Sequence, residues 1–427
     1  MTAISPTAAY DDSSSMEILV ASVAMLLLAI QLVNLATFNL QPAKLRLIID
    51  GLSLVGYGGL VAITLLYSRV TTVVHLLGLI LFSGAAFVTL ALHPESTSLS
   101  SFIGHVTSPM LLGILTMRRI PAPGPRGPGL LWLAATAAAV LAVALALLGT
   151  PYTLAGIQRL AIFAGGEGGV HPSAYATACF FLTLLVLWRA KVGLRWITLL
   201  ILGLLAYVLF KYQVRTVWLM LAIFAGINAL YWLSRRSILL LVAGIGAALL
   251  AAVMILLVMS NSRFDVGRFS SGRTLIYAER LEVISSRGPI ELLFGSGSGT
   301  DKMRGVSAWR WGEKNSHNDF MTVTIELGLV GLIGFLLMIA AALAALPPTR
   351  KGWVIMIITS SLVSNGVLVR PTIGAPLILI AFLSLALRER SLERSSEEEV
   401  WLDYERHTAT PPLAGASGTP NLARPDV

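Results

Sequence analysis

Hydrophobic residues in this chain gather in long runs that are separated by short polar segments. Runs such as 18–36, 130–148 and 239–259 reach the roughly 20 residues that an α-helix needs to cross about 30 Å of hydrocarbon. A helix satisfies its own backbone hydrogen bonds in lipid and an open strand does not, so each run predicts a transmembrane helix. About twelve spans follow from this pattern, near 16–37, 45–67, 70–92, 101–117, 129–149, 172–188, 196–210, 216–233, 238–259, 317–346, 353–369 and 371–387.

The composition agrees with a membrane protein. Of 427 residues, 56% are hydrophobic and 12% charged, against about one quarter charged in an average soluble domain. The formal net charge is +9, but Lys and Arg are scattered between the apolar runs, so we expect no nucleic-acid partner. The single cysteine, Cys179, lies inside an apolar run, which excludes disulfides and a cysteine-ligated metal. The first fifteen residues have two Asp and no basic residue, so no cleavable signal peptide is predicted.

Basic residues also predict the orientation of the spans. If both termini are cytoplasmic, the cytoplasmic loops hold most short-loop charges, as the positive-inside rule expects: Arg69, Arg118, Arg119, Arg126, Arg189, Lys191, Arg195, Arg235, Arg236, Arg350 and Lys351. Segments near 150–171 and 260–316 then face outward. The predicted organisation is an all-α polytopic bundle: a cytoplasmic tail (1–15), a transmembrane domain (16–387) and a disordered cytoplasmic tail (388–427).

The long outward segment is rich in basic residues, against the topological rule. It carries Arg263, Arg268, Arg273, Arg280, Arg287, Lys302, Arg304, Arg310 and Lys314. One interpretation is an anionic ligand. The other is a solvated amphipathic helix, because Leu275, Leu281 and Ile284 recur near helical spacing beside Glu279 and Glu282.

The end of this segment carries a recognisable pattern. His317 is followed by Asn318, nine residues, Gly328, two residues and Gly331, with the last two in an apolar helix. This resembles the signature of the bacterial O-antigen ligase and polymerase family, whose members have about a dozen spans and a large periplasmic loop directly before this helix. Further similar positions lie at 170–174, 214–216, 271–273 and 295–299, so the likeness covers roughly residues 150 to 345.

The resemblance implies a GT-C-like glycosyltransferase of the bacterial inner membrane with its active site facing the periplasm. Its donor would be a glycan on undecaprenyl pyrophosphate, and its acceptor a hydroxyl of another glycan or of lipid A-core. Membrane lipid, a flippase and a chain-length regulator are the further partners that such a pathway implies. No cofactor is expected. No pair of Asp separated by one residue occurs in the chain, so we also expect no metal.

Two arginines suit the pyrophosphate, because a guanidinium grips phosphate oxygens in pairs and stays charged. Arg215 lies at an outward helix start, where free backbone N–H groups add positive potential. The resemblance carries both Arg215 and Arg273 over as pyrophosphate-contacting residues. The competing interpretations are headgroup anchoring for Arg215, beside Lys211, and a surface ion pair with a nearby Glu for Arg273.

His317 is the candidate base. An unperturbed imidazole titrates near pH 6.5 and can accept the proton of an acceptor hydroxyl at neutral pH. The competing interpretation is a histidine that caps or packs at a helix start. Asn318 belongs to the motif, and Gly328 and Gly331 are predicted to allow close helix packing. Glu326, inside the same helix, is expected to orient an arginine or line a cavity, without a catalytic role.

Three functions stay open at this point. A polymerase, slightly favoured because every repeat-unit pathway needs one, adds the growing chain to another lipid-linked unit. A ligase adds it to lipid A-core or to a protein. A secondary transporter has as many spans, but the chain shows neither an inverted repeat nor paired broken helices at matching positions.

Overall fold

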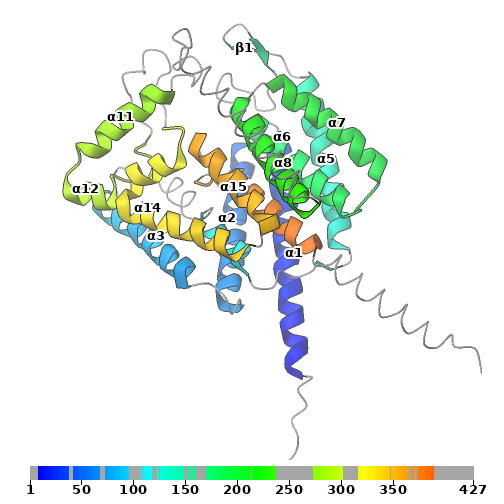
Figure 1. Cartoon of the computed structure of the whole chain (residues 1–427), viewed down its shortest axis with the longest axis horizontal. Helices are drawn as coiled ribbons and strands as arrows, with labels where there is room; N and C mark the ends of the chain where they lie inside the picture. Colours follow the sequence, from blue (N-terminus) through cyan, green and yellow to red (C-terminus); the bar gives the residue numbers. More distant parts are fainter. Residues whose placement is uncertain are drawn as a thin grey trace, which may run out of the picture.

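A computed structural model describes residues 8–37, 42–67, 73–95, 107, 109–117, 123–124, 126–148, 152–154, 157–159, 170–212, 214–236, 273–301, 316–346, 348–363, 367–369 and 373–388. These residues form a helical bundle (Figure 1). Within them, the sheet structure is one antiparallel ladder of two three-residue strands, β1 (Tyr152–Leu154) and β2 (Ile157–Arg159). The predicted helical fold class therefore holds, with a short hairpin added in the segment at 150–171, which is predicted to face outward.

Among the described residues, seven helices are long and apolar enough to cross a membrane: α1 (Ala8–Thr37), α2 (Ala43–Tyr67), α3 (Val73–Leu92), α5 (Gly127–Leu148), α6 (Val170–Arg189), α7 (Arg195–Tyr212) and α14 (Asp319–Ala345). The others are η1 (Leu111–Thr116), α8 (Arg215–Arg236), α11 (Arg273–Ser285), α12 (Pro289–Phe294), α15 (Pro348–Val363) and a last helix, Ile373–Arg388. The chain is a multi-pass membrane protein. The larger count of about twelve spans stays a prediction.

Several predicted boundaries differ from the structure. The span predicted at 101–117 ends in the 3-10 helix η1, whose six residues, at a rise of about 2 Å each, cover only about 12 Å. α1 begins at Ala8, so half of the predicted N-terminal tail is helical. α15 ends at Val363, before the predicted end at 369. The predicted span at 238–259 and the tail beyond Arg388 lie outside the described residues.

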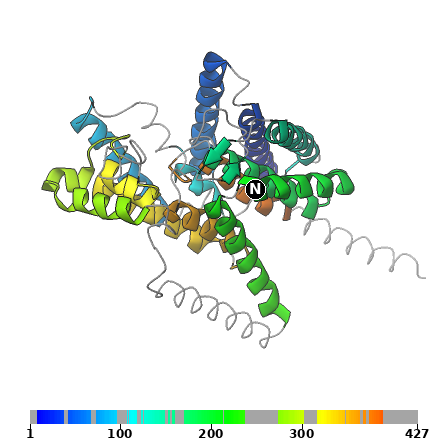
Figure 2. The ribbon, with the colours of Figure 1, turned by 90° about the horizontal axis from the view of Figure 1, so that it is seen from above.

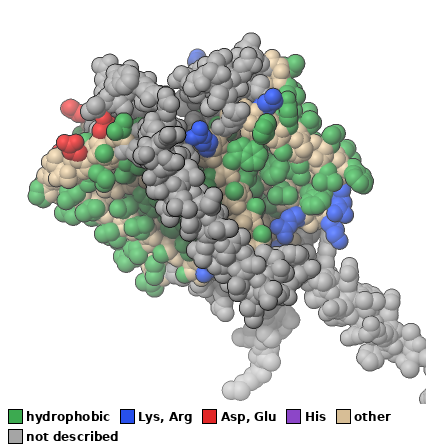
Figure 3. Space-filling model, turned by 45° about the horizontal axis from the view of Figure 1, so that its top comes forward, with side chains coloured by type: hydrophobic (Ala, Val, Ile, Leu, Met, Phe, Trp, Pro, Cys, Tyr) green, Lys and Arg blue, Asp and Glu red, His purple; other side chains and the backbone are tan. Residues whose placement is uncertain are grey.

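The core and the lipid-facing surface are apolar for different reasons. η1, most of α6 and most of the last helix are enclosed on all sides, and they supply much of the buried core. Large side chains such as Val55, Phe87 and Leu130 are instead exposed on the outer faces of α2, α3 and α5. Figure 3 shows such hydrophobic side chains over much of one face. In a spanning bundle these positions face hydrocarbon.

The helices form two groups with a third between them. α3, α11, α12 and α14 lie together on one side, α5, α6 and α7 on the other, and α1 and α15 between them (Figures 1 and 2). β1 and α11 lie at one end of the bundle, and α1 starts at the opposite end (Figure 1). The described parts of the two segments predicted to face outward, β1 and α11, thus lie at the same end.

α3 and α14 approach closely because glycines face each other across the contact. A Cβ on Gly78 would lie 2.9 Å from the carbonyl oxygen of Gly334, and a Cβ on Gly334 would lie 2.5 Å from the backbone nitrogen of Phe82. Neither position has room for a side chain. Small residues that let backbones approach are the usual basis of helix pairing in lipid, where there is no hydrophobic driving force between helices.

Candidate functional site

The start of α14 is built by the predicted motif residues themselves. Asn318 is the N-cap: its side-chain oxygen accepts hydrogen bonds from the backbone N–H groups of Phe320 at 2.9 Å and Met321 at 3.2 Å. Such a cap satisfies donors that a helix start leaves open. Asn318 therefore fixes where the helix begins, directly after His317.

His317 has a left-handed backbone, with φ of 57°, and is half-buried. This conformation is uncommon outside glycine, although histidine is among the residues enriched in it. The carbonyl oxygen of His317 lies 3.3 Å from the hydroxyl of Tyr277, which is also 3.3 Å from the carbonyl oxygen of Leu362. Tyr277 thus brings α11, the start of α14 and the end of α15 to one point.

A buried carboxylate supports the residue before the histidine. Oδ2 of Asp301 accepts from the N–H and the hydroxyl of Ser316, both at 2.9 Å, and from the hydroxyl of Thr322 at 2.7 Å. The guanidinium of Arg280 lies 3.4 Å from Oδ1, and both partners of this ion pair are almost completely buried. Asp301 is therefore the centre of a polar cluster that joins α11, the segment after α12 and the start of α14.

A second carboxylate, on Asp319, faces a different segment. It accepts from the backbone N–H groups of Val367 at 3.0 Å and Leu368 at 2.7 Å. It therefore holds the bend between α15 and the last helix against α14.

α14 is broken at Gly328, where φ is 70° and ψ is −169°. The carbonyl oxygens just before the break accept hydrogen bonds from outside the helix. Ser296 N–H donates to Ile325 at 3.1 Å, and Gly297 N–H donates to Glu326 at 3.3 Å. Buried backbone groups in a membrane protein must be satisfied in some such way.

The break requires glycine on both sides of the contact. A Cβ on Gly328 would lie 2.3 Å from the carbonyl carbon of Leu293, and a Cβ on Gly295 would lie 2.2 Å from the carbonyl oxygen of Glu326. Both glycines have positive φ. Gly331 is constrained by its own helix, because its Cβ would lie 2.4 Å from that of Leu327. Gly328 thus permits a change of direction and a close contact with the end of α12.

Two of the basic residues in the long segment predicted to face outward bind protein groups. Arg280 pairs with Asp301, and Arg287 donates to the carbonyl oxygen of Ile325 at 2.7 Å. Burial lowers the pKa of Arg287 from its ordinary value, and the negative charges of Glu291 and Asp301 oppose that shift. Part of the charge that suggested an anionic ligand therefore has a structural role. Leu275 and Leu281 on α11 are exposed, and Ile276 and Arg280 form its buried face.

The two arginines predicted to bind pyrophosphate each begin a helix. Arg215 is exposed at the first residue of α8. Arg273 is the first residue of α11, one turn before Tyr277, and its side chain lies outside the described residues. α8 packs on α15 through Phe224 and Trp353, whose ring centroids are 4.4 Å apart. α15 therefore contacts the helix of Arg215, while its end meets the helix of Arg273 through Tyr277.

Sequence reasoning missed Asp301, Tyr277, Ser316 and Thr322. Of these four, Asp301 has a signal in the sequence: it is an acidic residue between basic ones, just after the glycine run at 295–299. The Oε1 of Glu326 accepts a hydrogen bond from the backbone N–H of Asp301 at 3.3 Å, a contact that the sequence did not predict.

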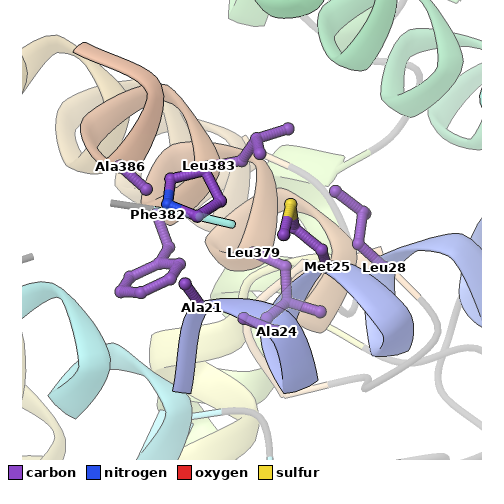
Figure 4. A pocket seen from close by; sticks show the side chains of 9 residues that line it. Ala21, Ala24, Met25, Leu28, Leu379, Phe382, Leu383 and Ala386 are labelled. Atoms are coloured by element: carbon purple, nitrogen blue, oxygen red, sulfur yellow. The ribbon is translucent and has the colours of Figure 1, made fainter. Parts of the chain in front are cut away.

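A shallow hollow lies between α1 and the last helix (Figure 4). None of the predicted site residues lines it, and its lining is apolar throughout: Ala21, Ala24, Met25, Leu28, Pro123, Leu379, Phe382, Leu383 and Ala386. It offers no group for acid, base or phosphate chemistry.

The fold and this site define a multi-pass helical membrane protein with a polar cluster at the start of a broken spanning helix. The chain matches no known family model, no curated protein and no solved structure. Its function is therefore argued from its own residues and from the motif they form.

Proposed function

We propose that the chain is a glycosyltransferase of the O-antigen ligase and polymerase type, which transfers a glycan from undecaprenyl pyrophosphate to a hydroxyl acceptor on the periplasmic side of the inner membrane. The strongest support for this function is the local structure of the motif. The motif residues His317, Asn318, Gly328 and Gly331 each have a distinct place in one local structure, with a half-buried histidine of left-handed backbone directly before the helix. Strained backbone of this kind clusters at functional sites.

In the proposed reaction, the imidazole of His317 accepts the proton of the acceptor hydroxyl. The hydroxyl oxygen then bonds to the anomeric carbon of the donor sugar, with inversion. The bond from that carbon to the pyrophosphate oxygen breaks, and undecaprenyl pyrophosphate leaves with the electron pair. Arg215 and Arg273 stabilise the charge that grows on this leaving group.

Within this function we favour a polymerase, which uses a second lipid-linked repeat unit as its acceptor. The alternative is a ligase that uses lipid A-core or a protein. A knockout separates them: loss of a polymerase leaves a single repeat unit on the final acceptor, and loss of a ligase leaves long chains on the lipid carrier. A secondary transporter is the rival from another class, and a knockout that alters no glycan would favour it.

The direct test is transfer by the purified protein in nanodiscs, with a lipid-pyrophosphate-linked repeat unit as donor. His317→Ala should lower kcat by about 100-fold to 10,000-fold, the range for loss of a general base. His93→Ala is the matched control, because His93 directly follows α3, outside the motif. Near-normal turnover in His317→Ala would refute the base assignment.

Arg215→Lys tests the pyrophosphate assignment, since lysine keeps the charge and loses the paired geometry. Full activity in this variant would favour headgroup anchoring instead. Transfer should also persist in excess chelator. A loss that magnesium or manganese restores would refute metal independence.

A further inference from the structure

We propose that Asp301 is a positioning residue for His317, an inference that rests on the proposed function through the role of His317 as base. Asp301 lies 16 positions before the histidine, in the turn after α12. It does not touch the imidazole in the described contacts. It acts instead on the backbone that carries the ring.

The contact is made at the residue before the histidine. One carboxylate oxygen, Oδ2, accepts both the N–H and the hydroxyl of Ser316, so the peptide unit and the side chain of that residue are fixed together. The same oxygen accepts the hydroxyl of Thr322, one turn into α14. Asp301 therefore holds the chain on both sides of His317.

The contacts of Asp301 matter because His317 has a left-handed backbone. In a residue other than glycine this conformation is unfavourable, and it persists only where the surrounding contacts hold it in place. Three constraints meet at His317. Asp301 holds Ser316, Asn318 caps the following helix, and Tyr277 lies 3.3 Å from the histidine carbonyl oxygen. Of these, only Asp301 has a buried countercharge.

Arg280 supplies that countercharge and a second connection. Its guanidinium pairs with Oδ1 and donates to the carbonyl oxygen of Asp301 at 3.3 Å. At 3.4 Å the pair is an ion pair and not a short charge-assisted hydrogen bond, but both charges are buried, and a buried charge is costly unless an opposite charge lies beside it. α11 thus fixes the carboxylate, which in turn fixes the residue before the proposed base.

The test uses the full chain in nanodiscs and the variants Asp301→Asn, Thr322→Val and Thr322→Ser. Asp301→Asn keeps the shape and replaces one acceptor oxygen by a donor. It should lower kcat by about 100-fold, because a displacement of about 1 Å at a reacting group has that effect, while KM for the donor stays within about twofold. Thr322→Val should show a smaller loss, and Thr322→Ser, which keeps the hydroxyl, should restore the rate.

Asp319→Asn is the matched control. Its carboxylate is equally buried, but it binds Val367 and Leu368 instead of Ser316. It should reduce thermal stability as Asp301→Asn does, with little change in kcat per folded molecule. An equal fall in kcat for both variants would overturn the inference and assign the effect to general loosening of α14.

A second readout does not depend on glycan transfer. The rate at which diethylpyrocarbonate modifies His317, followed by peptide mass spectrometry, should change in Asp301→Asn and stay at the wild-type value in Asp319→Asn. An unchanged rate in Asp301→Asn would also overturn the inference. If instead the wild-type protein transfers no glycan while this rate responds as expected, the proposed function fails and the positioning role of Asp301 stands.

Discussion

The two halves of α14 are held by different kinds of contact. After Gly328, the helix packs on α3 through Gly78 and Gly334, and the contact is made by backbones without polar side chains. Before Gly328, it is held by charges and hydrogen bonds from Asp301, Arg287 and the turn at 295–297.

The difference separates the part of the helix suited to lipid from the part that lies next to the proposed site. Close packing of small residues is sufficient where the surroundings are hydrocarbon and the requirement is stability. Hydrogen bonds are directional, so a polar cluster specifies where a side chain lies more narrowly than apolar packing does. The half that carries His317 is the half with the directional contacts.

Gly328→Ala, at the junction of the two halves, should have the largest effect on stability. Alanine would combine a positive φ with a backbone overlap, for a loss of about 3 kcal/mol in the free energy of unfolding. Thermal unfolding in detergent, followed by the fluorescence of the 9 tryptophans, measures this. Gly203→Ala in α7 is the control, because no atom lies within 4 Å of its added Cβ. Equal midpoints for the two variants would contradict the role of the break.

Gly334→Ala should have a smaller effect, and on stability alone. Its Cβ would overlap the backbone of Phe82, which predicts a loss of about 2 kcal/mol from overpacking. Because the contact lies in the apolar half, kcat per folded molecule should stay near the wild-type value. A fall in kcat as large as that of Gly328→Ala would show that the halves are not separable in this way.

The smallest expected effect concerns His317 itself. His317→Gly and His317→Ala both remove the imidazole, but only glycine adopts a φ of 57° without strain. His317→Gly should therefore unfold at a higher temperature than His317→Ala, by about 1 kcal/mol of stability, while both are inactive. The reverse order would mean that the left-handed backbone at this position is not maintained in solution.

Hydropathy predicted the length of α14 well, but it did not predict the break at Gly328 that separates its two parts. The run from 317 to 346 is read as one span, and the helix observed there ends one residue earlier, at Ala345. The break at Gly328 has no hydropathy signal, because apolar residues continue on both sides of it. The periodicity of a run reports how long a helix is, and the location of a kink depends on what packs against it.

The candidate site shows the same limit. The motif drew attention to His317 and Asn318, which are neighbours in sequence. Tyr277 contacts the histidine carbonyl oxygen, and Asp301 contacts the residue before the histidine, only through the fold, from 40 and 16 positions away from His317. A pattern in a single sequence shows only how residues are spaced along the chain. The contacts of Asp301 and Tyr277 depend instead on how α11 and the turn after α12 pack against the start of α14, so no such pattern shows them.

The docked turn at 295–297 also has a consequence for engineering. Because its N–H groups complete the hydrogen bonding of a broken helix, the outward segment is not an independent module attached to a membrane scaffold. Exchanging this segment alone with that of another protein would strand two carbonyl groups inside the bilayer region. Chimeras that exchange the proposed site should therefore transplant residues 273–346 as a single unit.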